Sequence, residues 1–122
     1  MRYIFDVKRG QDLSSLYKKR GILKITDRRK LHVLTQTHKI LYNNCPEYLK
    51  CFVTTMRDVD LIGRSRAHRL RLLAPRVNVT VPEQCFQVQC YRQWNSLSPN
   101  LCMNENSSAF KKKIKEAIIS SY

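Results

Sequence analysis

Apolar side chains and one histidine recur at helical spacing in one long stretch of this chain. They fall at i, i+3, i+7 and i+10, which are Leu31, Leu34, His38 and Leu41. A stripe of this period is typical of an amphipathic helix that buries one face. Thr26 and Asp27 stand directly before it as caps, so the pattern predicts a helix from Arg28 to Asn43.

Short helices are predicted on both sides of that long one. Asp12 is placed to cap a helix whose apolar residues are Leu13, Leu16 and Tyr17. Gly21 then supplies the left-handed conformation that ends it. Pro46 forbids continuation of the long helix and suits the first turn of a new one, from Glu47 to Val53.

The C-terminal part has two further helical patterns. Between Phe86 and Leu97, Cys90 and Trp94 share one helical face, although alternation at the start of this segment also allows a strand. We favour a helix in the second half at least, ended by Pro99 and Asn100. The last helix is expected to be capped by Ser107 or Ser108 and to bury its apolar stripe, Phe110, Ile114, Ala117 and Ile118.

One segment has the two-residue period of β-strands. Arginines alternate with leucines over 69–72, and valines alternate with polar residues over 77–81, which predicts a hairpin about Ala74-Pro75-Arg76. The stretch from Thr54 to Gly63 has no period and is expected to be a loop. Residues 1–122 are therefore predicted to form one α+β, mainly α domain, with four to five helices and a short β-hairpin.

The charge of the chain indicates a polyanionic partner. Lys and Arg number 23 against 9 Asp and Glu, a formal net charge of +14. Such an excess repels itself in a compact domain, which favours binding to nucleic acid or to an acidic surface; the alternative is a solvated lysine-rich surface. No apolar run approaches the ~18 residues that span a bilayer, so we expect a soluble intracellular protein without a membrane partner.

Metal binding and catalysis find little support among the residues. The five cysteines form an odd set, and only Cys85 and Cys90 come near zinc-ligand spacing, so free thiols and no metal or other cofactor are expected. Polymerase chemistry needs carboxylates that converge on two metal ions. The nearest approach is Asp58 with Asp60, which lack a third acid and a glycine-rich loop, so we expect no enzyme activity.

Three segments in fixed order carry a resemblance to a known family. They are 28–49, with Arg-Arg-Lys-Leu-His at its start and Pro-Glu-Tyr-Leu at its end, 92–97 (Arg-Gln-Trp-Asn-Ser-Leu) and 107–114 (Ser-Ser-Ala-Phe-Lys-Lys-Lys-Ile). Together with the opening Arg2-Tyr3-Ile4-Phe5, they resemble the region that closes the reverse transcriptase of jockey-like non-LTR retrotransposons, downstream of the polymerase active site. The chain departs from that pattern at Ser98, where the family has proline.

The resemblance implies a C-terminal fragment of a larger polymerase protein that helps to hold RNA or a primer-template duplex. The family's catalytic aspartates have no counterpart here. The matching positions are Arg28, Arg29, His32, Lys39, Leu41, Pro46, Tyr48, Leu49, Arg64, Trp94, Asn95, Leu97, Phe110 and Lys111, of which most are expected to be architectural.

Basic residues are the remaining candidates for a site that binds RNA or single-stranded DNA. They are Arg28, Arg29 and Lys30 at the start of the long helix, Arg64, Arg66, Arg69, Arg71 and Arg76 about the hairpin, and Lys111 and Lys112 on the last helix. Trp94 and Tyr91 could stack on bases, but a Trp at helical spacing with Phe86 and Cys90 favours a core position. Two alternatives stay open: a module that docks on an absent polymerase domain, and a remnant with no selected activity.

Overall fold

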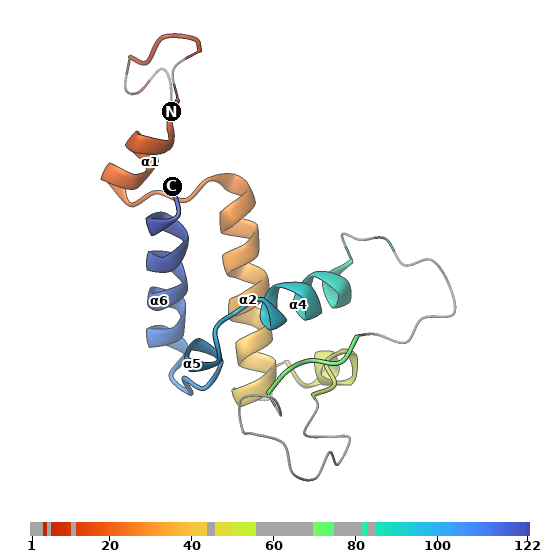
Figure 1. Cartoon of the computed structure of the whole chain (residues 1–122). Helices are drawn as coiled ribbons and strands as arrows, with labels where there is room; N and C mark the ends of the chain where they lie inside the picture. Colours follow the sequence, from red (N-terminus) through yellow and green to blue (C-terminus); the bar gives the residue numbers. More distant parts are fainter. Residues whose placement is uncertain are drawn as a thin grey trace.

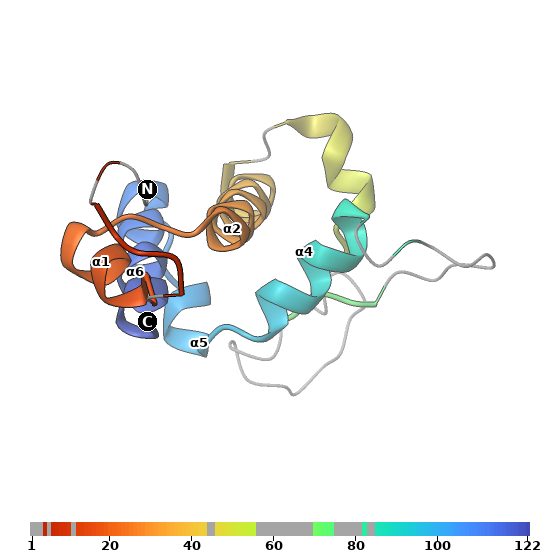
Figure 2. The same ribbon diagram turned by 90° about the horizontal axis from the view of Figure 1, so that it is seen from above.

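The computed structural model describes residues 4, 6–10, 12–43, 46–55, 70–74, 82 and 85–122. Within them the chain forms α1 (Ser14–Arg20), α2 (Ile25–Asn43), the 3₁₀ helix η1 (Glu47–Phe52), α4 (Phe86–Asn95), α5 (Pro99–Cys102) and α6 (Ser107–Ser120). Helix α2 is central: α6 runs antiparallel to it, and α4 crosses it on another side (Figures 1 and 2). The prediction of a small, mainly helical domain is confirmed.

Helix α2 begins at Ile25, three residues before Arg28, which is the start that Thr26 and Asp27 as caps predicted. Asp27 lies within the first turn, where an acidic residue complements the helix dipole, and its Oδ2 accepts a hydrogen bond from the Tyr122 hydroxyl at 2.7 Å. The Tyr122 hydroxyl in turn accepts one from the Lys24 backbone N–H at 2.9 Å. The end of α6 is thereby fastened to the start of α2.

The caps of the other helices also differ from the prediction by small shifts. Asp12 does accept hydrogen bonds, from the backbone and hydroxyl of Ser14, but the cap position of α1 is Leu13. Gly21 has φ 62° and ends α1 as expected. Asn106, not Ser107 or Ser108, caps α6, because its Oδ1 accepts from two backbone N–H groups of the first turn.

The helix that was predicted between Phe86 and Leu97 is present as α4, but Pro99 does not stop helical structure. Pro99 occupies the first turn of α5, a position that proline's fixed φ suits. On α6, Phe110 and Ile114 are buried, whereas Ala117 is exposed. The buried stripe therefore continues through Ile118, which is half-buried, and omits Ala117.

The core contains an aromatic cluster in which a histidine is fully buried. His38 of α2 stacks on Phe110 of α6, with ring centroids 4.4 Å apart, and lies 4.6 Å from the ring of Tyr42. Trp94 of α4 completes the cluster, 5.7 Å from Phe110 and 1% exposed. The three longest helices thus meet through aromatic contacts, and Trp94 is the core residue that its spacing predicted.

His38 is held as a neutral donor. Its Nε2 lies 2.6 Å from the carbonyl oxygen of Asn104, which can only accept, so the proton is on Nε2. Nδ1 is buried and has no partner among the described residues. Burial lowers the pKa of His38 from its ordinary value of 6.5, and the bond to Asn104 acts in the opposite direction.

No β-hairpin is found in the part of the chain that the structure describes. Leu72 instead forms an isolated antiparallel bridge with Thr55, and the Leu73 N–H donates to the Thr54 carbonyl at 2.9 Å. Residues of the expected loop therefore pair with the first expected strand. The second strand, over 77–81, falls outside the described residues.

The side-chain amide of Asn95 occupies the position that a partner strand would take. Its Oδ1 accepts from the Leu72 N–H at 2.9 Å, and its Nδ2 donates to the Leu72 carbonyl at 2.8 Å. The neighbouring Trp94 Nε1 donates to the Leu70 carbonyl at 2.9 Å. These bonds satisfy backbone groups of Leu70 and Leu72 and fix this segment on the end of α4.

We predict that Asn95→Asp destabilises the domain by roughly 2 kcal/mol, because a carboxylate oxygen would face the Leu72 carbonyl and leave it without a donor. Asn100→Asp, at an exposed position of α5, is the matched control. Urea unfolding followed by circular dichroism measures both. Equal midpoints for the two variants would show that the Asn95 bonds contribute nothing.

We also predict that the stability falls as the pH drops below 6.5. Because the His38 pKa is lower in the folded state, the unfolded chain takes up the proton first, and the free energy of unfolding decreases until the folded-state pKa is reached. Unfolding at pH 7.5 and 5.5 measures the difference. His38→Gln, which keeps a donor but does not titrate, should reduce it, whereas His32→Gln at an exposed position should not. If His32→Gln reduced the difference and His38→Gln did not, the pH dependence would not come from His38.

Candidate nucleic-acid interface

The predicted basic triplet at the start of α2 is exposed, but its members do not share one side of the helix. Successive residues of an α-helix are about 100° apart, so Lys30 lies about 200° from Arg28. Lys30 Nζ is 3.7 Å from the Asp27 carboxylate, on the side of the helix that faces Tyr122. Lys30 is 57% exposed and Asp27 15%, and an ion pair that solvent still reaches contributes little stability. Arg28 and Arg29 form no such bond with the described residues.

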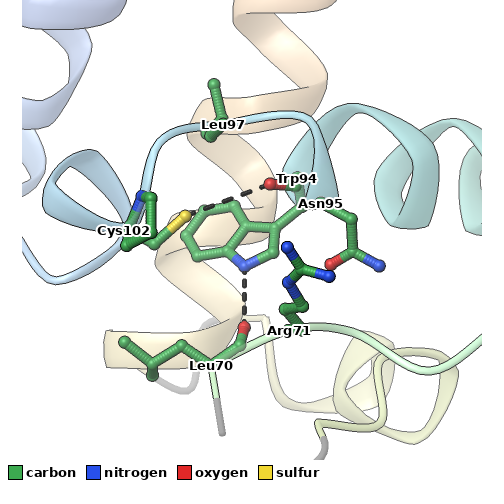
Figure 3. Close-up of a pocket in the computed structure, with 7 residues that line it drawn as sticks. Leu70, Arg71, Trp94, Asn95, Leu97 and Cys102 are labelled. Atoms are coloured by element: carbon green, nitrogen blue, oxygen red, sulfur yellow. Dashed lines mark hydrogen bonds between the residues drawn. The ribbon is translucent and has the colours of Figure 1, made fainter. Parts of the chain in front are cut away.

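Arg71 is the one residue of the predicted hairpin arginines that falls within the described residues. It is exposed, while Leu72 beside it is buried, so the expected alternation of sides is present. Figure 3 shows its side chain in a small pocket, beside Trp94 and Asn95, which Leu97 and Cys102 also line. Arg64, Arg66, Arg69 and Arg76 lie outside the described residues.

Lys111 and Lys112 are exposed near the N-terminal end of α6. Because α6 is antiparallel to α2, that end is far from the basic triplet, which lies beside the other end of α6 (Figure 1). The described candidate residues therefore occupy three separate places: the start of α2, the pocket at the end of α4, and the start of α6. The structure does not bring these three groups together.

The two candidate aromatic residues of α4 are poorly placed for stacking on bases. Trp94 is buried, with its Nε1 engaged by Leu70 (Figure 3), and Tyr91 is half-buried against the core. Among the described residues, aromatic rings are exposed on η1, where Tyr48 is 72% exposed and Phe52 49%. This exposure was not predictable from the sequence, because a short helix without a clear apolar stripe does not reveal which side packs.

The cysteines are separated by the fold. Cys90 is buried in α4, with its Sγ 3.0 Å from the hydroxyl of Thr37, and Cys102 is buried in α5. Cys51 is exposed and Cys85 half-buried, and these four are free thiols. No group of three potential metal ligands occurs within the described residues. Asp58, Asp60 and Cys45 fall outside them, so the expected absence of metal and of catalysis stays a prediction.

Burial controls the chemistry of the two core thiols. It raises the pKa of Cys102 to about 11, against the opposing effect of Arg71, and also raises the pKa of Cys90, against the effect of its hydrogen bond with Thr37. Both groups are therefore thiols rather than thiolates near neutral pH.

None of the described helices is long and apolar enough to cross a membrane.

A thiol reagent applied to the native protein should thus modify Cys51 rapidly, and Cys90 and Cys102 only after unfolding, because the thiolate is the reactive form. Mass spectrometry of peptides after timed labelling would identify the sites, and metal analysis of the same sample should find no stoichiometric zinc. Labelling of Cys90 or Cys102 as fast as of Cys51, or one zinc per chain, would contradict this description.

Comparison with known proteins adds no relative to this description: no family model, no curated protein sequence and no solved structure matches the chain.

Proposed function

We propose that the chain is a non-catalytic nucleic-acid-binding segment that holds RNA or single-stranded DNA through basic contacts with the phosphate backbone. The observation that carries the proposal is the formal net charge of +14, together with the exposure of the described candidate cations. Arg28 and Arg29 in particular are available to a ligand, because their side chains bond to no other described residue. The resemblance to the closing region of jockey-like reverse transcriptases supports the same function.

The positions of Arg28 and Arg29 are hard to explain by the stability of α2. Cations are unfavourable near a helix N-terminus, and both arginines lie at the end of the first turn and the start of the second. The basic residues of α1 differ, since Lys18, Lys19 and Arg20 lie in the last turn, where the dipole favours them. A bound phosphate would offset the unfavourable interaction of these two arginines with the helix dipole.

Docking on a polymerase domain is the second candidate function. Among the described residues, the observation that favours it is the exposure of large apolar side chains: Ile4, Ile25, Tyr48 and Phe52. These belong to an N-terminal segment, the start of α2 and η1, so they do not form one element's apolar face. The basic surface therefore supports nucleic-acid binding better.

The purified chain should bind RNA and single-stranded DNA with little sequence preference and with steep salt dependence. Each neutralised phosphate contributes about 0.7 to the log-log slope on a single strand, so four to six contacts give a slope of roughly −3 to −4. Replacing Arg66, Arg69 and Arg71 by Ala should flatten the slope by about 2 units. Replacing Lys111, Lys112 and Lys113 should have less effect if α6 mainly closes the core.

Fluorescence anisotropy of a labelled oligonucleotide, titrated at several salt concentrations, measures the slope. An affinity that responds neither to salt nor to the arginine substitutions would overturn the proposal and favour the docking module.

A further inference from the structure

The outer side of α2 carries a basic stripe that extends beyond the predicted triplet. At about 100° per residue, Arg28, His32 and Lys39 fall within about 40° of one another, and Arg29 lies about 60° from His32. All four are exposed, whereas Leu34 and Thr37, on the opposite side of the helix, are buried. The stripe spans 12 residues, from Arg28 to Lys39, or about 16 Å of helix.

The side chains of this stripe are not used by the fold. None of the four forms a hydrogen bond or an ion pair through its side chain with another residue of the described ranges, in contrast to Lys30, which lies beside Asp27. The stripe contains no acidic residue: the carboxylate of α2 is Asp27, which faces Lys30 and Tyr122. The outer side of α2 is thus a ridge of positive charge.

The 3₁₀ helix η1 packs beside α2 near its C-terminal end, where the stripe finishes (Figures 1 and 2). It presents Tyr48, 72% exposed, and Phe52 to solvent. Glu47 and Lys50 of η1 are both exposed and cancel in charge, so η1 adds aromatic surface but no net charge. A positive ridge and a neighbouring helix with exposed aromatic rings together offer the two contacts that single-stranded nucleic acid makes with proteins.

We propose that this surface, formed by Arg28, Arg29, His32 and Lys39 of α2 with Tyr48 of η1, binds a single strand of RNA or DNA: α2 contacts consecutive phosphates, and Tyr48 stacks on a base. The proposal rests on the proposed function and assigns it to one face of the fold. Compared with the predicted triplet Arg28, Arg29 and Lys30, this surface omits Lys30 and adds His32, Lys39 and Tyr48.

The two kinds of contact have separable signatures, since phosphate contacts release counterions and stacking does not. The variant Arg28→Ala, Arg29→Ala, Lys39→Ala should flatten the salt slope for an oligouridylate by about 2 units. The matched control removes three exposed lysines elsewhere, Lys19→Ala, Lys113→Ala, Lys115→Ala, and should change the slope clearly less. All substituted side chains are exposed, so circular dichroism and thermal unfolding should match the parent protein.

Tyr48→Ala should lower the affinity for the oligouridylate about tenfold without changing its salt slope. On an oligonucleotide of the same length made of abasic residues, Tyr48→Ala and the parent should bind equally, because no base is left to stack. Equal flattening by both triple variants, or an unchanged affinity of Tyr48→Ala for the oligouridylate, would overturn the proposal. If the parent protein binds no nucleic acid at all, the proposed function itself fails.

Discussion

The bonds from Trp94 and Asn95 to the backbone of Leu70 and Leu72 hold the middle of the chain on the helical bundle. Between η1 and α4, the described residues belong to no helix and share an isolated bridge between Thr55 and Leu72, so their other backbone groups need partners elsewhere. Asn95 supplies both a donor and an acceptor to Leu72, and the indole of Trp94 supplies a donor to Leu70. Leu72 can then be buried while Arg71 remains exposed.

The same tryptophan connects this segment to the aromatic core. Its ring lies against Phe110 of α6 and near His38 of α2, so one side chain contacts three elements that are far apart in the sequence. The core accepts a fully buried imidazole because its Nε2 finds the carbonyl of Asn104 at 2.6 Å. Tyr42 of α2 adds a second hydrogen bond, from its hydroxyl to the carbonyl of Cys102 at the end of α5. The sides of α2 that face α4 and α6 are thereby occupied, and the side that carries Arg28, His32 and Lys39 stays exposed.

Periodicity predicted the elements whose burial depends on their own sequence. The stripe of α2, the burial of Trp94 with Cys90, and the left-handed Gly21 were all predictable, because each depends on local spacing or on a single backbone conformation. The hairpin could not be judged in this way. The two-residue period of 69–72 predicted a strand, whereas in the described part of this stretch Leu72 forms an isolated bridge with Thr55 and bonds to a side chain 23 residues away, and no local pattern encodes such a pairing.

The sequence predicted that the candidate site is basic, but not how its side chains are arranged on the fold. In the sequence, Arg28-Arg29-Lys30 is one cluster of basic residues. In the helix, Lys30 lies beside Asp27, while Arg28 shares a side with His32 and Lys39. The exposure of Tyr48 depends on how η1 docks on α2, which the sequence of η1 does not determine. Antiparallel packing of α2 and α6 likewise separates Lys111 and Lys112 from the arginines, although all were candidates for nucleic-acid binding.

Chemical-shift mapping by NMR tests the central claim most directly. A ¹⁵N-labelled protein titrated with a short oligouridylate at low salt should show its largest amide shift changes along the outer side of α2, at Arg28, Arg29, His32 and Lys39, and at Tyr48 of η1. Leu31, Ile40 and Ile114, which are buried, should change little. Changes confined to the start of α6 and to Arg71, with α2 and η1 unaffected, would contradict the account.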